Sequence, residues 1–160
     1  MGFLAEIIMK IKDVDLVVIH CSATREGQDV RREDIKGMHL KRGFNDVGYH
    51  IIIYLDGTVV KGRDLDVMGA HVEGFNRNSW GICYIGGLDK DGKPKDTRTL
   101  AQNHSLKQVI EVLKVLAPKA EVKGHRDLSP DKNKDGVIDK VDWLKMCPCF
   151  DVEKWVKPFL

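Results

Sequence analysis

The chain has 160 residues, of which 42% are hydrophobic and 31% charged, and its formal net charge is +2. This length fits one domain with a buried core, and the near-balanced charge offers no broad positive field for nucleic acid. The longest apolar runs span four or five residues, whereas a membrane-spanning helix needs about 20. We therefore expect one monomeric domain over residues 1–160, with neither nucleic acid nor membrane as partner.

The N-terminal segment, residues 1–12, does not read as a secretory signal. Glu6 interrupts it and no long apolar core follows, although such a core is what an export signal requires. We therefore expect the protein to be cytoplasmic when it is synthesised.

A strand and a helix are predicted next. The run 17–21 is rich in β-branched residues and is followed by a polar turn, which predicts a buried strand within residues 13–23. Apolar positions at helical spacing predict a helix over residues 30–42, ending near Gly43.

A hairpin and a further strand are predicted in the middle of the chain. The apolar runs 49–55 and 58–61 flank Asp56-Gly57, and Asp-Gly between two such runs is typical of a tight hairpin turn. Residues 80–85 form another apolar run before a Gly-Gly pair and are predicted to be a strand.

The last third of the chain carries the strongest helix signal. Thr99, with Gln102 three residues later, has the pattern of a capping box, and helically spaced apolar residues continue to position 116. A short strand is predicted at 121–123 and a short helix at 152–160. Mixed strands and helices of this kind predict an α/β fold with a central mixed sheet flanked by helices.

Three residues from distant parts of the chain are candidates for a metal site. His20 and His125 each lie at the C-terminal end of a predicted strand, where side chains are presented to a cleft, and Cys147 lies in a loop. Two imidazoles and one thiolate with a fourth position open are typical of catalytic zinc, which supplies hydroxide near neutral pH. No short motif joins the three residues, so a satisfied strand-end histidine and a small buried cysteine remain the alternative.

A series of short segments, in a fixed order, resembles the zinc-dependent N-acetylmuramoyl-L-alanine amidases of the phage-lysozyme type, relatives of the peptidoglycan recognition proteins. The segments are V-V-I-H-C-S-A-T at 17–24, D-V-G-Y-H-I-I-I at 46–53, D-G-T-V-V-K-G-R-D at 56–64, G-A-H at 69–71, N-S-W-G-I-C-Y-I-G-G at 78–87, G-H-R-D at 124–127 and K-M-C-P-C-F-D at 145–151. The set covers nearly the whole chain from about residue 13 to about residue 151 and is far more specific than any one segment.

The resemblance implies roles for five residues. His20, His125 and Cys147 fall on the three zinc ligands of the family, and Tyr49 and Lys145 fall on its catalytic tyrosine and lysine. Because all five are present, the resemblance implies an active enzyme. Such an enzyme hydrolyses the amide between the lactyl group of N-acetylmuramic acid and L-alanine of peptidoglycan, and acts on the cell wall after release or export.

The segment around residues 69–76 resembles the loop that lines the substrate groove of the family. His71 and Asn76 are therefore candidates for substrate contact. The alternative is a polar loop held by its own hydrogen bonds.

The connection between His125 and Cys147 is longer than in compact phage members, with an insertion at about 128–144. Its spacing fits a calcium loop of the EF-hand type. The candidate ligands are Asp131, Asn133, Asp135, Val137, Asp139 and Asp142. Pro130 precludes an ordinary entering helix and three lysines offset the acidic charge, so a turn stabilised by its own side chains is the alternative.

The remaining histidines and cysteines are predicted to be structural. His50 follows Tyr49 and should point to the opposite face of the sheet, and His39 and His104, on predicted helices, should be surface or partly buried residues. Cys21 should face away from its neighbour His20. A disulfide between Cys147 and Cys149 would be strained, so Cys149 is expected to be a free or buried thiol.

Two other functions remain open from the sequence. The chain could bind muropeptide without cutting it, although the complete set of five residues favours an enzyme. It could also be a cysteine hydrolase with Cys147 as nucleophile and His125 as base, in which case its activity would survive metal chelators.

Overall fold

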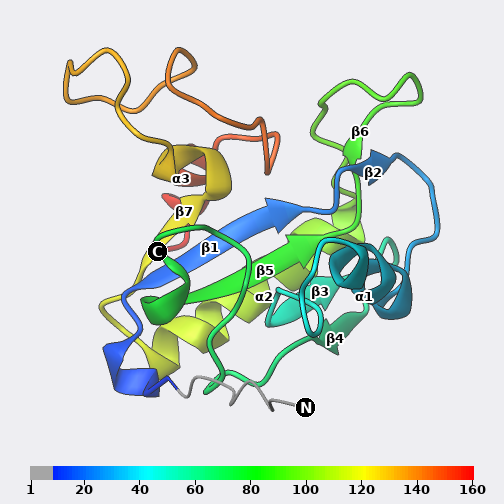
Figure 1. The fold of residues 1–160 in the computed structure, drawn as a ribbon, viewed down its shortest axis with the longest axis horizontal. Coiled ribbons are helices and arrows are strands. Elements are labelled where there is room, and N and C mark those ends of the chain that lie inside the picture. Colours follow the sequence, from blue (N-terminus) through cyan, green and yellow to red (C-terminus); the bar gives the residue numbers. More distant parts are fainter. Residues whose placement is uncertain (1–8) are drawn as a thin grey trace.

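A computed structural model describes residues 9–160, so most of the N-terminal segment for which we predicted no export signal lies outside the described range. A five-stranded sheet forms the centre of the molecule, with strand order β4-β3-β5-β1-β7 (Figure 1). Its strands are β1 (Leu16–Cys21), β3 (Ile51–Ile53), β4 (Val59–Lys61), β5 (Ser79–Tyr84) and β7 (Glu121–Gly124). Only the β3–β4 pair is antiparallel among these neighbours, which confirms the mixed sheet.

Strand β1 lies inside the sheet, between β5 and β7. It pairs in parallel with both, from Leu16 opposite Ser79 to Cys21 opposite Tyr84 on one side. Every residue of β1 after Leu16 is buried, as expected for a parallel strand covered on both faces. The predicted strand is confirmed.

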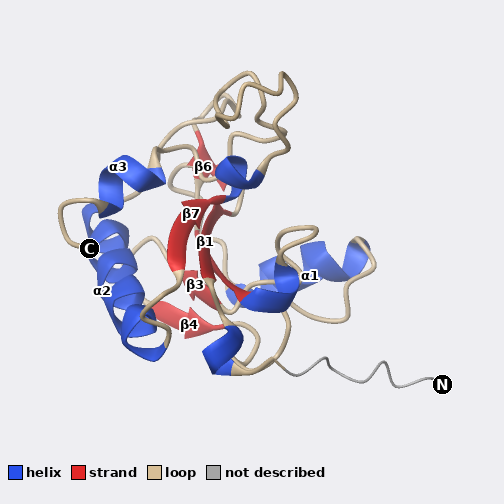
Figure 2. Cartoon of the chain, turned by 90° about the vertical axis from the view of Figure 1, so that its left-hand side faces the viewer, coloured by secondary structure: helices blue, strands red, loops and turns tan. Residues whose placement is uncertain are grey.

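Helix α2 (Leu100–Leu116) covers one face of the sheet, and α1 (Arg32–Lys41) lies on the other (Figure 2). Leu106, Ile110 and Leu113 recur at helical spacing and share a core with inward residues of β1 and β5. On the opposite face Ile35 of α1 belongs to a smaller core with Ile52. The two helices confirm the patterns at 99–116 and 30–42.

The N-terminus of α2 is fixed as its capping box predicts. Thr99 Oγ1 accepts the N–H of Gln102, and the N–H of Thr99 donates to Gln102 Oε1, each at 3.0 Å. The amide group of Gln102 also donates to the carbonyl oxygens of Ile53 and Ile85. The cap therefore ties the helix to the ends of two strands.

Two predicted boundaries differ from the structure. At the hairpin the N–H of Tyr54 donates to the Thr58 carbonyl and the N–H of Gly57 donates to the Tyr54 carbonyl, each at 2.9 Å, and Gly57 has φ +85°. This is a three-residue loop with a left-handed glycine and not a two-residue turn. Helix α3 (Val152–Val156) ends early: Lys157 still has a helical backbone, but Pro158 has no N–H with which to continue the helical hydrogen bonds.

The structure adds short elements that we did not predict. They are a two-stranded parallel sheet of β2 (Thr24–Arg25) and β6 (Gly87–Leu88), and 3-10 turns at Ile11–Asp13, Asn76–Asn78 and His125–Leu128. Within residues 9–160, no helix has both the length and the apolar character needed to cross a membrane.

His50 connects the start of β3 to β5 and to the loop after β4. Its side chain is fully buried; Nδ1 accepts the N–H of Gly81 at 3.0 Å and Nε2 donates to the carbonyl of Val67 at 2.8 Å. Burial lowers the pKa of His50 from 6.5 to about 4.

The stability of the metal-free protein should therefore fall as the pH is lowered from 6.5 to about 4. In this window the unfolded chain binds a proton at His50 that the folded chain excludes, which corresponds to about 2 kcal/mol at pH 4.5. Thermal unfolding across this range measures the effect. His50→Gln should flatten the slope, and His104→Gln on the exposed side of α2 should not. A midpoint independent of pH in the parent protein would contradict the prediction.

Candidate metal centre

A cleft of about 620 Å³ opens where β1 and β7 end. In α/β sheets, ligands bind in the crevice beyond the carboxyl ends of parallel strands. Its lining includes Tyr49, His71, Lys145 and the three candidate metal ligands. The fold thus gathers the predicted catalytic residues and the three predicted zinc ligands at one edge of the sheet.

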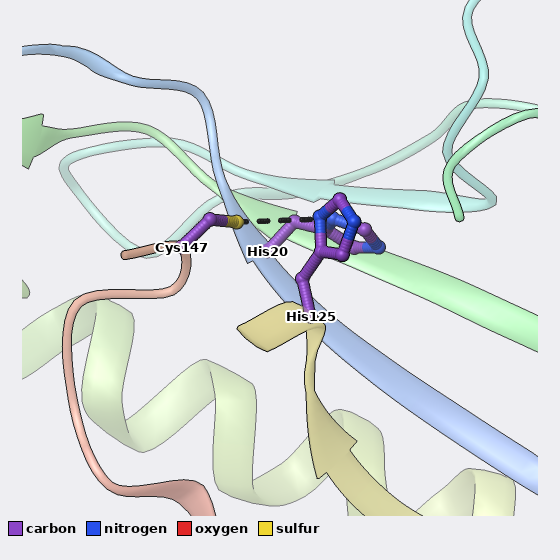
Figure 3. Close-up of side chains that lie close together, drawn as sticks. All are labelled: His20, His125 and Cys147. Atoms are coloured by element: carbon purple, nitrogen blue, oxygen red, sulfur yellow. Dashed lines mark hydrogen bonds between the residues drawn. The ribbon is translucent and has the colours of Figure 1, made fainter. Parts of the chain in front are cut away.

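The nitrogen and sulfur atoms of His20, His125 and Cys147 converge in this cleft (Figure 3). One ligand atom from each lies within 4.8 Å of the others. Across residues 9–160 this is the only group of three or more His, Cys, Asp or Glu side chains that converges in this way. Two nitrogens and one sulfur suit zinc with a fourth position left open.

Each of the three side chains is held by a different element. His20 is near the end of β1, and His125 begins the 3-10 turn that follows β7. The loop of Cys147 is fastened to both: the N–H of Cys21 donates to Cys147 Sγ at 3.2 Å, and the N–H of Arg126 donates to the Cys147 carbonyl at 2.9 Å.

A chain of hydrogen bonds sets the orientation of His20. Ser79 Oγ donates its single proton to the carbonyl of Phe75 at 2.7 Å, so it must accept from His71 Nε2 at 3.1 Å. His71 Nδ1 then accepts the proton of His20 Nε2 at 2.9 Å. His20 Nδ1 is left with a free lone pair, and this nitrogen faces Cys147 Sγ at 3.8 Å.

Burial keeps the imidazoles neutral. Desolvation, followed by the neighbouring histidines, lowers the pKa of His20 well below 6.5. Desolvation and the Lys145 charge lower the pKa of His125 to about 4. Both side chains therefore offer lone pairs at neutral pH, which is the state that a metal ion requires of histidine.

Tyr49 and Lys145 both line the cleft that holds the three candidate ligands. The ring of Tyr49 is 5.1 Å from that of His20, centroid to centroid, and its hydroxyl interacts with the Cys83 thiol. Burial raises the pKa of Tyr49 well above 10, so its hydroxyl keeps its proton. Lys145 is exposed at the rim of the cleft and forms no salt bridge within the described part of the chain.

His71 and Asn76 also border the cleft, but protein groups occupy most of their polar atoms. Both ring nitrogens of His71 form hydrogen bonds inside the protein. Asn76 Oδ1 accepts the N–H groups of His71 and Val72. The predicted contact of these two residues with substrate stays a prediction. In the structure His71 contacts the candidate ligand His20, and Asn76 holds the backbone at residues 71 and 72.

Two expectations about the other histidines were wrong. His39 was expected to be a surface or partly buried residue but is buried, and its Nδ1 accepts the N–H of Gly48 at 2.8 Å. His50 and Tyr49 do not point to opposite faces: both approach the His20–His71 pair, because regular strand begins only at Ile51. Ser79 was not singled out from the sequence, where a lone serine before a strand carries no distinguishing signal.

The chain belongs to the N-acetylmuramoyl-L-alanine amidase family, whose sequence profile matches residues 10–137. It is 39% identical over 148 residues to the endolysin of Enterobacteria phage K11, covering 92% of this chain and 89% of that one. It is 37% identical over 144 residues to the endolysin of Escherichia phage T7, covering 90% and 86%.

Solved structures show the same fold at lower identity. Bumblebee peptidoglycan recognition protein SA superposes with a TM-score of 0.74 at 23% identity, covering 100% of this chain and 89% of that one. The Ph2119 endolysin of a Thermus scotoductus bacteriophage superposes with a TM-score of 0.72 at 22% identity, covering 98% of this chain and 90% of that one. The predicted fold and family are confirmed.

The segment from Asp131 to Asp142 forms a self-contained turn. Asp131 accepts the N–H groups of Lys134 and Gly136 through its two oxygens. Asp142 is buried and accepts the N–H groups of Lys132 and Asp139, which lowers its pKa. These contacts are those of a turn stabilised by its own side chains. The carboxylates of this segment do not converge on one point in the described structure, and calcium binding stays a prediction.

Millimolar calcium should accordingly leave the thermal unfolding midpoint unchanged. The carboxylates already bind backbone N–H groups, so calcium would have to displace or reorganise these contacts. Thermal unfolding with added calcium, compared with the same ionic strength of sodium, measures this. A midpoint that rises with calcium and not with sodium, and that does not rise in Asp131→Asn, would establish the calcium loop instead.

Proposed function

We propose that this chain is a zinc-dependent amidase that hydrolyses the bond between the lactyl group of N-acetylmuramic acid and L-alanine in peptidoglycan. The observation that carries the proposal is the convergence of His20, His125 and Cys147 in a cleft of a chain that belongs to the N-acetylmuramoyl-L-alanine amidase family. Cys147 lies beyond the end of the family match, so the structural convergence adds support that is independent of the profile.

The donor set fits zinc. His20 Nδ1 has a free lone pair directed to the Cys147 sulfur, and the Cys147 sulfur already accepts a backbone N–H. When bound, zinc polarises a carbonyl and lowers the pKa of water to about 7. The chain's own contribution is to hold the three ligands in place and to leave one side open to the cleft.

Lys145 and Tyr49 would assist the reaction from the walls of the cleft. Hydrolysis of the amide places negative charge on the carbonyl oxygen, and the Lys145 ammonium at the rim can stabilise that charge. The leaving amine of L-alanine needs a proton. Tyr49, which keeps its proton because of its raised pKa, can supply it or position the attacking water.

The biological setting follows from the substrate. Peptidoglycan is the proposed partner, and the enzyme would act on the cell wall after release or export. The phage relatives named endolysins support a role as a phage or prophage lysis enzyme, with a bacterial wall-remodelling enzyme as the other setting. The complete His20, Tyr49, His125, Lys145 and Cys147 set favours catalysis over muropeptide binding alone.

Mass spectrometry of a defined muramoyl-peptide after incubation with the protein tests the proposal. We expect release of a peptide with a free L-alanine amine, no cleavage by Cys147→Ala or after chelation, and recovery of the chelated sample with zinc. Lys145→Met should keep its zinc and lose about 10²–10³-fold in kcat. Cleavage that persists under chelation would support the cysteine hydrolase, and binding without cleavage would support a recognition module.

Zinc affinity should depend on His71 and then on Ser79. His71→Ala removes the acceptor that holds His20 Nε2, and loss of such a partner lowers metal affinity about 10–100-fold. Ser79→Ala should have a smaller effect, because it removes only the hydroxyl that holds His71. Competition with a zinc-binding dye measures both. Surface His104→Ala is the matched control, and equal affinity in all four proteins would refute the role of the hydrogen-bond chain.

A further inference from the structure

Two cysteines outside the proposed ligand set face each other beside the metal centre. Cys21 Sγ and Cys149 Sγ are 4.0 Å apart, and both thiols are free. Cys21 directly follows His20, and Cys149 comes two residues after Cys147. The pair therefore joins the two chain segments that supply two of the three candidate zinc ligands.

The backbone aims the Cys149 thiol at Cys21. Cys149 has φ +71°, a left-handed conformation that is uncommon and unfavourable for a residue other than glycine. The N–H of Cys149 donates to the Met146 carbonyl at 2.7 Å, and its thiol donates to the Gly87 carbonyl at 3.3 Å. These contacts hold the two sulfurs in a small shared space.

Gly87 shows how closely this space is packed. A Cβ atom at Gly87 would lie 2.4 Å from Cys21 Sγ and 2.7 Å from Cys21 Cβ. Any side chain at position 87 would therefore collide with the Cys21 thiol. A disulfide requires the two sulfurs to close from 4.0 Å to about 2.05 Å.

We propose that Cys21 and Cys149 form a disulfide when the protein reaches an oxidising compartment. This rests on the proposed function, because a peptidoglycan substrate lies outside the cytoplasm, where disulfides form and persist. The bond would tie the end of β1 to the loop that carries Cys147 and so restrain the metal centre.

The chemistry balances with a disulfide as the oxidant, such as oxidised glutathione. The half-buried Cys149 thiolate attacks it, giving a mixed disulfide and one reduced glutathione. Cys21 then attacks the Cys149 sulfur and releases the second glutathione. The protein loses two protons and two electrons, and one glutathione disulfide becomes two thiols.

The other two cysteines are poorly placed for this reaction. Cys83 is fully buried and its thiol interacts with Tyr49 and the Tyr84 carbonyl. Cys147 is a proposed zinc ligand, and metal coordination protects its thiolate. Cys149, by contrast, is partly exposed and gives an oxidant access to the pair.

The test uses the zinc-loaded protein incubated with oxidised glutathione and digested without reduction. Thiol–disulfide exchange depends on the access of the oxidant to the thiol, so the reaction is followed over hours. We expect a cross-linked peptide pair containing Cys21 and Cys149, with Cys147 still free to alkylate after denaturation and zinc content unchanged.

The cross-link should also raise the thermal midpoint. It closes a loop between residues 128 apart in sequence, and long loops give the largest restriction of the unfolded chain, so we expect a rise of about 5 °C or more. Cys149→Ser should abolish both the cross-link and the rise, whereas Cys83→Ala should retain them.

Two results would overturn the proposal: Cys21 and Cys149 both remaining free after overnight oxidation, or Cys147 appearing in the cross-link in their place. Because the readout is peptide mass, it is independent of amidase activity. A protein that forms the cross-link but does not cut peptidoglycan would refute the proposed function alone.

Discussion

The parallel pairing of β1 with both β5 and β7 is the constraint on which the rest of the site depends. Parallel strands bring their carboxyl ends to the same edge of a sheet, so the ends of β1 and β7 place His20 and His125 side by side. Apolar cores on both faces of the sheet hold this arrangement. The cleft is therefore a consequence of topology, and the loop of Cys147 only has to dock against an edge that already exists.

Burial of so many imidazoles needs hydrogen bonds to be tolerated, because an unpaired buried polar group destabilises the fold. The path from the Phe75 carbonyl through Ser79 and His71 to His20 meets this requirement. The direction of every hydrogen bond in this path is fixed, because the Ser79 hydroxyl has one proton and donates it to the Phe75 carbonyl. One backbone carbonyl thereby determines which nitrogen of His20 is available to a metal ion.

The last part of the chain completes the centre through backbone contacts. The amide of Cys21 reaches the Cys147 sulfur, and the amide of Arg126 reaches the Cys147 carbonyl. The self-stabilised turn from Asp131 to Asp142 lies between His125 and this loop and is closed by local hydrogen bonds. The chain thus returns to the site with Lys145, Cys147 and Cys149 on one short segment. A bond formed at Cys149 would therefore restrain the position of Cys147.

The sequence by itself determined the main elements, the mixed sheet and the five candidate residues of the centre. Hydrophobic periodicity and the Thr99 cap are local signals that the sequence carries directly. The segments that resemble the amidase family run along the chain from about residue 13 to about residue 151. The exact hairpin loop was missed because it depends on backbone hydrogen bonds that the sequence does not show. The early end of α3 was missed although Pro158, which lies inside the predicted helix, has no N–H to continue it. Only the tertiary structure decided that His39 is buried, that His71 holds His20, and that Cys21 faces Cys149. Each of these contacts joins residues whose sequence neighbours carry no sign of the partner, because the partner is supplied by packing between distant segments.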